Sequence, residues 1–142
     1  MEALRPAIAD RLRSLSQWIA HHAYPLGFTN YATPDQVLLH GMAPAITIAA
    51  HHHPDAFATC AELGPGSGAL GLAIATLAPT LHVDLADRRR KVIDYLELAI
   101  ACNAVPNATA LLFDAARPGS QTQWDIVCFR ALAKPAEALA LA

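Results

Sequence analysis

The most chemically distinctive stretch of the chain is a glycine-rich turn that follows a short apolar run. It reads Glu62-Leu63-Gly64-Pro65-Gly66-Ser67-Gly68-Ala69-Leu70-Gly71. A strand that ends in glycines and turns directly into a helix lets a ligand approach the backbone closely. The same geometry directs unpaired N–H groups and the positive end of the helix at that ligand. The turn therefore predicts a cofactor-binding site with contacts at Gly64, Gly66 and Gly68.

Glu62 distinguishes between the cofactors that such a turn can hold. The run Gly66–Gly71 spells GxGxxG, which by itself is only a weak indication of a dinucleotide site. A dinucleotide places a pyrophosphate near this turn, and a carboxylate two residues before the first glycine would repel it. S-adenosylmethionine (SAM) has no phosphate, and its ammonium group pairs with a carboxylate directly or through water. We therefore expect SAM, although an ordinary strand-to-helix turn is the alternative.

Two further acids are expected at the ends of strands. Asp87 follows the third alternating glycine by nineteen positions, where an acid accepts hydrogen bonds from ribose hydroxyls; a role as a helix N-cap is compatible with this. Asp84 competes for the ribose role but lies inside its strand. Asp114 either receives the adenine amino group or begins a loop. Arg88 and Ala115, which follow the two strand-end acids, are assigned to the cofactor as well.

These residues must be positioned by alternating strands and helices. Helical periodicity and apolar runs predict helices at 4–22, 34–50, 69–77, 88–103 and 133–142, and strands at 58–63, 81–86, 109–113 and 125–129. Thr33 and Gln36 form a capping box around Pro34 in the second helix, and Pro44 kinks or splits that helix. We expect a helical extension over 1–56 and a parallel-sheet, Rossmann-like cofactor domain over 57–142.

Composition excludes several classes of protein. The chain has 142 residues, of which 54% are hydrophobic and 15% charged, and its net charge is −2. It is therefore globular, and any contact with nucleic acid must depend on a local basic patch. No apolar run is long enough to span a membrane, and the expected location is cytoplasmic. His51–His53 are adjacent and lack partners at zinc-like spacing, so no metal site is expected. The oligomeric state stays open.

Three blocks of sequence resemble a known family. The first is the glycine turn with its preceding acid. The second begins at Asp87 and continues through a basic run to Tyr95-Leu96, and the third runs from Trp124-Asp125 through Arg130-Ala131 to Ala133. Together they resemble the 16S ribosomal RNA guanine-N7 methyltransferases, also called the glucose-inhibited division protein B family. Phe28-Thr29 and Thr33-Pro34 add a looser match.

The resemblance implies a class I SAM-dependent methyltransferase fold, a three-layer Rossmann-like sandwich that acts on 16S ribosomal RNA in the small ribosomal subunit. Guanine N7 carries an in-plane lone pair and no proton, so methyl transfer requires placement rather than a general base. Arg130 would hold an RNA phosphate, the target base or the cofactor carboxylate, and is the catalytic candidate; a surface ion pair is the alternative. Arg89, Arg90 and Lys91 are candidates for RNA contact, or form a solvated first helical turn.

The chain also departs from that family. An Asp-Ser pair is missing from the stretch His40–Ala45, Pro65 and Leu70 replace a usual Ser and Pro, and the chain stops at Ala142 before the expected closing strands. The sequence therefore predicts a domain whose C-terminal part is missing. Two alternatives stay open: a non-catalytic remnant that at most binds SAM, and a nicotinamide-dependent oxidoreductase, which Glu62 disfavours.

Overall fold

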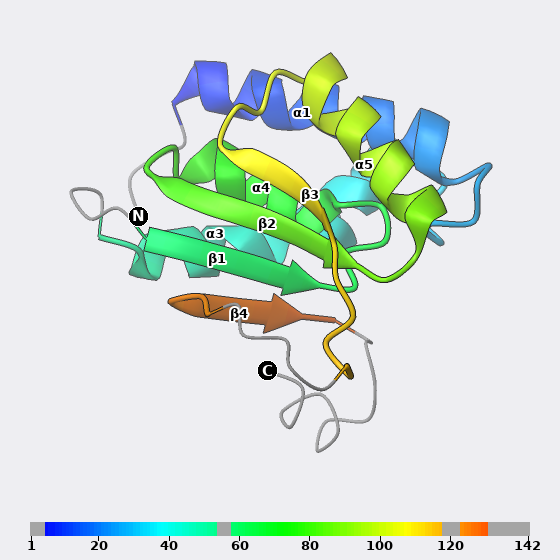
Figure 1. Ribbon diagram of the computed structural model, residues 1–142. Helices are drawn as coiled ribbons and strands as arrows, with labels where there is room; N and C mark the ends of the chain where they lie inside the picture. The colour runs from blue at the N-terminus through cyan, green and yellow to red at the C-terminus, as the bar shows by residue number, and fades with distance from the viewer. Residues whose placement is uncertain (1–4, 54–57, 118–122, 131–142) are drawn as a thin grey trace.

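The chain folds around a four-stranded sheet. The computed structural model describes residues 5–53, 58–117 and 123–130. Figure 1 shows the strands side by side, with the helices on one side of the sheet. The helices are α1 (Pro6–Ala23), α2 (Pro34–Gln36), the π-helix η1 (Val37–Met42), α3 (Ala43–His51), α4 (Ala69–Leu77) and α5 (Arg90–Cys102). The strands are β1 (Ala58–Leu63), β2 (Leu81–Asp87), β3 (Ala108–Leu112) and β4 (Ile126–Phe129).

The sheet is entirely parallel and has the order β3-β2-β1-β4. Leu63 at the end of β1 pairs with Ala86 on one side and with Phe129 on the other. The chain runs from β1 outward to β2 and β3 and then returns to place β4 on the opposite side of β1. Ligands of open parallel sheets bind at the carboxyl ends of the strands where the order reverses in this way. The predicted α/β fold of the class I methyltransferases is confirmed.

Strand β4 is fastened to β1 by side chains as well as by backbone pairing. The Thr59 N–H and hydroxyl both donate to Asp125 Oδ2, at 2.8 Å and 3.1 Å. The Asp125 N–H in turn donates to the Thr59 carbonyl at 3.1 Å. The hydrogen bonds from Thr59 lower the pKa of the Asp125 carboxyl group. These contacts hold the start of β4 against β1.

One hydrophobic core joins the helices to one face of the sheet. Ile19 of α1, Ile74 of α4, Leu85 of β2 and Leu96 of α5 are all fully buried in it. Because α1 and α3 share this core with the sheet, the helical prefix covers α4 directly. The division of the chain at residue 56 stays a prediction.

The opposite face of the sheet carries a second, smaller hydrophobic cluster. Trp124 lies in the cluster that covers Ala61 and Ala86, and its indole Nε1 donates to Asp84 Oδ2 at 2.8 Å. Its ring also meets the Phe113 ring nearly edge-on, with centroids 5.4 Å apart. Asp84, considered above for the ribose, is thus engaged by Trp124 inside the strand.

Most predicted elements are present, with small shifts at their ends. The strand at 58–63 and the helix at 69–77 have the predicted bounds. Helix α5 begins at Arg90 instead of Arg88, because Arg89 has extended backbone and its N–H donates to the Asp87 carboxylate at 2.9 Å. The helix predicted at 133–142 lies outside the described residues.

The helix predicted from 34 to 50 is split, as Pro44 led us to expect, but a π-helix that was not predicted lies at the division. The capping box of Thr33 and Gln36 is present, but the helix then widens into η1 before α3 begins. Pro44 lies in the first turn of α3, where its missing N–H is tolerated. The wider π turn precedes the proline and separates it from the capped start of the helix.

Candidate functional site

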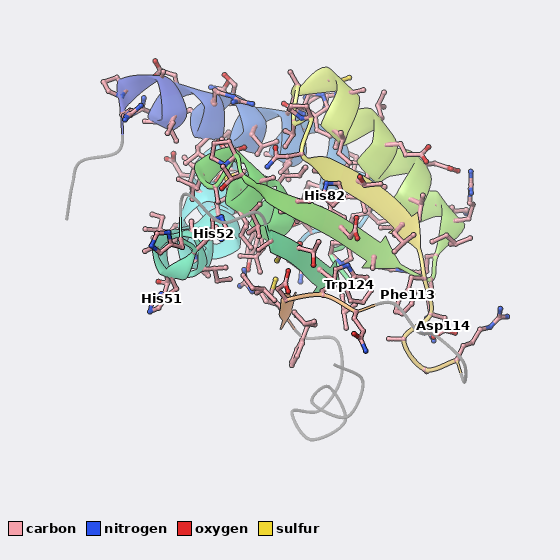
Figure 2. All side chains as sticks on the ribbon, turned by 60° about the vertical axis from the view of Figure 1, so that its left-hand side comes forward. His51, His52, His82, Phe113, Asp114 and Trp124 are labelled. Atoms are coloured by element: carbon pink, nitrogen blue, oxygen red, sulfur yellow. The ribbon has the colours of Figure 1, made fainter. Side chains whose placement is uncertain are left out.

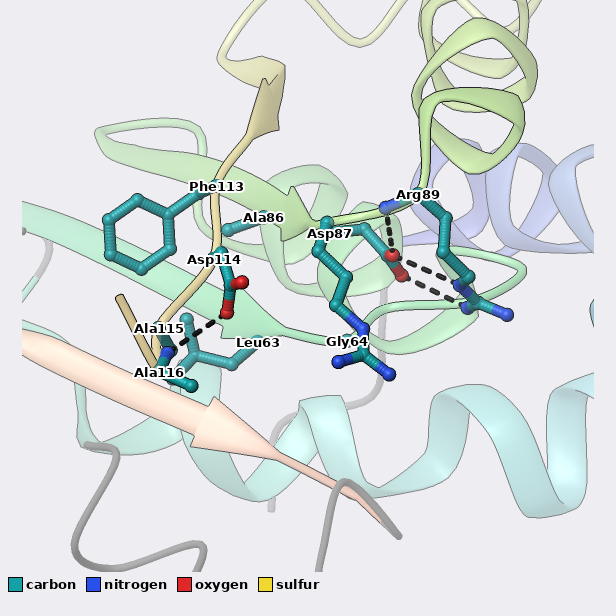
Figure 3. Close-up of a pocket in the computed structure, with 10 residues that line it drawn as sticks. Leu63, Gly64, Ala86, Asp87, Arg89, Phe113, Asp114, Ala115 and Ala116 are labelled. Atoms are coloured by element: carbon teal, nitrogen blue, oxygen red, sulfur yellow. Dashed lines mark hydrogen bonds and ion pairs between the residues drawn. The ribbon is translucent and has the colours of Figure 1, made fainter. Parts of the chain in front are cut away.

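Two cavities open at the carboxyl ends of the strands and share Gly64. The strand-end cavity has a volume of about 340 Å³ and lies beside the ends of β1, β2 and β3 (Figure 3). The glycine-turn cavity has a volume of about 240 Å³. The strand-end cavity is lined by Leu63, Gly64, Ala86, Asp87, Arg88, Arg89, Phe113, Asp114, Ala115 and Ala116. The glycine-turn cavity is lined by residues 28–31, Gly41, Glu62, residues 64–67, Ala69, Leu70 and Arg130.

The glycine turn has the left-handed backbone that its sequence predicts. Gly64, Gly66 and Gly68 have φ values of +68°, +55° and +76°. A Cβ atom at Gly66 would lie 3.0 Å from the carbonyl oxygen of Phe28, so a side chain there would be strained and crowded. Bare backbone of Gly64 and Gly66 therefore borders the glycine-turn cavity. Gly68, predicted above as a third contact, lines neither cavity and packs instead against Leu72 and Leu96.

Helix α5 braces this turn through a residue that sequence reasoning missed. The Tyr95 hydroxyl donates to the carbonyl oxygen of Ser67 at 2.9 Å, and both residues are buried. Burial raises the pKa of Tyr95. Its ring packs edge-on against Phe28, which lines the glycine-turn cavity. The only signal in the sequence was the aromatic-Leu pair of the second block.

Glu62 lies inside the glycine-turn cavity and is 3% exposed. Its Oε2 accepts a hydrogen bond of 2.8 Å from the N–H of Gly71, in the first turn of α4. Burial raises the pKa of Glu62 to about 8, while the Gly71 N–H and the positive charge of Arg130 act in the opposite direction. The carboxyl group therefore has a structural partner and also borders the cavity. A Cβ atom at Gly71 would lie 2.7 Å from Glu62 Oε2 and would overlap Leu85.

Arg130 reaches the same cavity from the end of β4. Its Nη1 donates to the carbonyl oxygens of His40 at 2.6 Å and Gly41 at 3.3 Å. In an α-helix the His40 carbonyl would accept from residue 44, which is a proline and has no N–H. The guanidinium supplies that missing donor. Arg130 is thus held by η1 and faces the cavity that contains Glu62. Within residues 5–53, 58–117 and 123–130 it forms no ion pair, so the surface ion pair considered above is not found there.

Asp87 and Arg89 meet in the strand-end cavity. The side chain of Asp87 is 3% exposed and that of Arg89 is 57% exposed. Asp87 Oδ1 accepts from the Arg89 N–H at 2.9 Å and from Nε at 3.1 Å, and Oδ2 accepts from Nη2 at 3.1 Å. The acid assigned to ribose and the arginine assigned to RNA therefore form an ion pair (Figure 3).

The far wall of the strand-end cavity follows β3. Asp114 and Ala115 both line it, as does Phe113, which sequence reasoning missed. Asp114 Oδ1 accepts the N–H of Ala116 at 3.0 Å, which is the loop-starting role considered as the alternative. The same carboxylate borders the cavity, so both roles are geometrically compatible.

The basic run that begins at Arg88 does not form a single patch. Arg88 and Arg89 line the strand-end cavity, whereas Arg90 pairs with Asp94 one turn along α5 at 3.1 Å. Lys91 is exposed on the same helix. The structure therefore places the first two cations at the cofactor-sized cavity and the other two on the adjoining surface.

His51 and His52 lie apart from this site. Figure 2 shows His51 and His52 at the end of α3, far from Phe113 and Asp114. His51 Nδ1 contacts the carbonyl oxygen of Thr47, and His52 Nε2 contacts the hydroxyl of Thr80. Among the described residues, no group of three or more His, Cys, Asp or Glu could hold a metal ion. Within the same ranges, no helix has the length and apolarity to cross a membrane.

Comparison with known proteins finds a matching family model and similar solved structures. The family model GidB, described as rRNA small subunit methyltransferase G, matches residues 9–142. A crystal structure of coclaurine N-methyltransferase bound to N-methylheliamine and SAH is similar to this chain with a TM-score of 0.56 and 14% sequence identity. That match covers 91% of this chain and 43% of the other, so it supports the fold. No curated protein matches the chain.

Proposed function

Because the chain belongs to the rRNA small subunit methyltransferase G family, we propose that it uses SAM to methylate N7 of a guanine in 16S ribosomal RNA. The observation that carries the proposal is the pair of cavities that meet at Gly64, one containing the buried Glu62 and the other the buried Asp87. The alternative is a protein that binds SAM without transferring its methyl group.

The two cavities suit the two ends of SAM. The amino-acid end would occupy the glycine-turn cavity, where Glu62 would accept from the ammonium and Arg130 would pair with the carboxylate. The ribose would reach Asp87, and the adenine would lie against Phe113 with Asp114 and the Ala115 N–H at its edge. Gly66 fits this arrangement because any side chain there would meet the Phe28 carbonyl.

The same contacts disfavour a dinucleotide. A pyrophosphate at the turn needs unpaired N–H groups in the first turn of the following helix. Here the Gly71 N–H is already bonded to Glu62, and that carboxyl group is buried beside the place a phosphate would occupy. The literal GxGxxG run therefore does not support an oxidoreductase.

SAM, when bound, supplies an electrophilic methyl group. The guanine N7 lone pair is already available, so the residues of this chain are needed for alignment and for exclusion of water rather than for proton removal. The loop at residues 28–31 and Gly41 of η1 line the cavity that would hold the methionine end, which places the helical prefix over the site. We propose that residues 1–56 act as an extension that closes the domain formed by residues 57–142.

The RNA would be held by cations around this opening. Arg89, Arg90 and Lys91 follow one another at the start of α5, and Arg130 reaches the glycine-turn cavity from β4. Phosphate contacts of this kind orient the RNA without reading its sequence. The partner would be the small ribosomal subunit, in keeping with the family description.

Cofactor binding is tested by calorimetry with S-adenosylhomocysteine (SAH). We expect Gly66→Val and Asp87→Ala each to weaken binding by at least tenfold, because the first blocks the turn and the second removes the ribose acceptor. Gly27→Val is the matched control: Gly27 also has a positive φ, of +73°, but a Cβ atom there would meet nothing within 4 Å. Unchanged affinity in both site variants would refute the proposed pocket.

Methyl transfer is tested separately with purified 30S subunits and labelled SAM. Label recovered at guanine N7 supports the proposed reaction. A folded protein that binds SAH normally but transfers no methyl group would favour the non-catalytic alternative.

A further inference from the structure

The carboxylate of Asp87, which is proposed to bind the ribose, already accepts hydrogen bonds from the flexible side chain of Arg89. Asp87 accepts three hydrogen bonds from Arg89, one from its backbone N–H and two from its guanidinium. The backbone contact belongs to the turn that leads into α5. The guanidinium, by contrast, is on a flexible stem, and the Arg89 side chain is 57% exposed.

The acceptor capacity of Asp87 is too small for both partners. A carboxylate offers about four acceptor positions, and Arg89 occupies three of them. A ribose that donates both of its hydroxyls needs two positions, so at least one guanidinium contact must break. Nε and Nη2 bind as a fork across the two oxygens, so losing one contact removes the geometry that holds the other.

We propose that the ribose of SAM displaces the Arg89 guanidinium from Asp87, and that the displaced cation binds a phosphate of the RNA substrate at the mouth of the strand-end cavity. The inference rests on the proposed function, because it takes Asp87 as the ribose acceptor. Arg88 lines the same cavity and Lys91 is exposed one turn further on, so the displaced guanidinium would join cations that already face this surface.

The consequence is that binding of the cofactor and binding of RNA are coupled. In the unliganded protein the charge of Arg89 is balanced by a buried acid, whereas in the cofactor-bound protein it is available to a phosphate. By linkage, a phosphate that draws Arg89 away must tighten SAM binding by the same factor. Arg89 thereby favours binding of RNA to protein that carries SAM.

The first experiment measures SAH binding by calorimetry in wild type, Arg89→Met and Arg13→Met. Arg13→Met is the matched control, since Arg13 forms an exposed ion pair of 3.0 Å with Asp10 on α1, away from both site cavities. Arg89→Met should bind SAH about twofold to fivefold more tightly, the range expected for releasing a partly exposed ion pair. Arg13→Met should bind as wild type does. Adenosine should gain affinity in Arg89→Met, while 2′,3′-dideoxyadenosine, which lacks the 2′ and 3′ hydroxyls that would bind Asp87, should not.

The second experiment measures binding of a fluorescently labelled oligouridine with and without saturating SAH, over a series of salt concentrations. In wild type and in Arg13→Met, SAH should tighten oligouridine binding about twofold to fivefold. It should also steepen the salt dependence by about 0.7 in log–log slope, the value for one added phosphate contact on a single strand. In Arg89→Met both effects of SAH should vanish. A purely structural role of Arg89 would not change the salt slope.

The outcomes separate this inference from its premise. The coupling is overturned if Arg89→Met binds SAH no more tightly than wild type, or if SAH does not change oligouridine binding in wild type. The proposed cofactor site stands in either case. A folded wild-type protein that binds no SAH overturns the proposed function and the coupling with it.

Discussion

At Glu62 the fold holds a carboxyl group where water does not reach it. The side chain is 3% exposed, and burial raises its pKa from the ordinary 4.5 to about 8 despite the Gly71 N–H and Arg130. The folded protein therefore binds this proton more tightly than the unfolded chain does. The stability that follows is fully present below about pH 4.5 and is lost as the pH rises through about 8.

This predicts a pH-dependent difference between wild type and Glu62→Gln, since the amide keeps the size of the side chain but does not titrate. Between about pH 4.5 and pH 8 the wild-type free energy of unfolding should fall, relative to that of the variant, by about 4 kcal/mol, at about 1.4 kcal/mol per pKa unit. Urea unfolding at several pH values measures both curves. Parallel curves over this range would show that Glu62 keeps an ordinary pKa in the folded protein.

A single buried acid thus combines a proposed role, toward the ammonium of SAM, with an observed one, the hydrogen bond to Gly71. Its position before the glycines predicted a site for the ammonium of SAM. The hydrogen bond to Gly71 depends on the close approach of α4 to β1, which leaves no space for a Cβ atom at that glycine. Glu62 and Gly71 are nine positions apart in the sequence, and the packing of α4 against β1 brings them together.

Among the elements, the helix interrupted before Pro44 has the clearest physical cause. Pro44 cannot donate to the carbonyl of His40, and Arg130 of the β4 end donates instead, at 2.6 Å. The same guanidinium borders the glycine-turn cavity. A break in a helix of the extension therefore fixes the position of a cation of the proposed site.

A double-mutant cycle tests this relation. Arg130→Met in the wild-type background should cost about 1 kcal/mol of unfolding free energy, because the His40 carbonyl loses its donor at a partly exposed position. In the Pro44→Ala background the backbone N–H of residue 44 becomes available, and the cost of Arg130→Met should fall close to zero. Chemical unfolding of the four proteins gives the coupling energy. Equal costs in the two backgrounds would mean that Arg130 does not replace the proline's missing donor.

The elements were predictable to the extent that their signals are local. The strand at 58–63, the helix at 69–77 and the capping box at Thr33 follow from apolar runs, glycines and a capping pattern within a few residues. The π turn of η1 was not predicted, because its stabilising partner, Arg130, lies 90 residues away from His40. For the same reason the glycine turn was predicted, whereas the hydrogen bond from Tyr95 to Ser67 that supports this turn was not.

The same distinction between local signals and long-range contacts applies to the site residues. The strand-end positions of Asp87 and Asp114 could be predicted from the strand pattern, and both line the strand-end cavity. What the pattern could not predict is which partner each side chain takes: Asp87 binds Arg89, and Asp114 accepts the Ala116 N–H. Partner choice depends on rotamers and packing, to which residue spacing gives no access.

At the scale of the whole molecule, the parallel order β3-β2-β1-β4 brings all four strand ends to one edge. The strand-end cavity depends on β1, β2 and β3, and the glycine-turn cavity depends on β1, on Arg130 after β4 and on the loop after α1. Gly64 is common to both. A ligand that occupies both cavities would therefore bridge elements from the beginning to the end of the described chain.

Amide hydrogen exchange tests whether one ligand spans both cavities. SAH should slow exchange at Gly64, Gly66 and Ser67 and, in the same experiment, at the residues around Asp114, because it contacts both sides of the Gly64 boundary. Adenosine alone should protect residues 113–116, and methionine alone should protect residues 28–31 and the glycine turn. A third cavity, of about 440 Å³ between α1, η1 and α3, is lined by Leu39 and Ile46 and provides an internal control whose amides should not respond. If SAH protected one cavity and left the other unchanged, the cofactor would occupy a single cavity, and the assignment of both Glu62 and Asp87 to one ligand would be wrong.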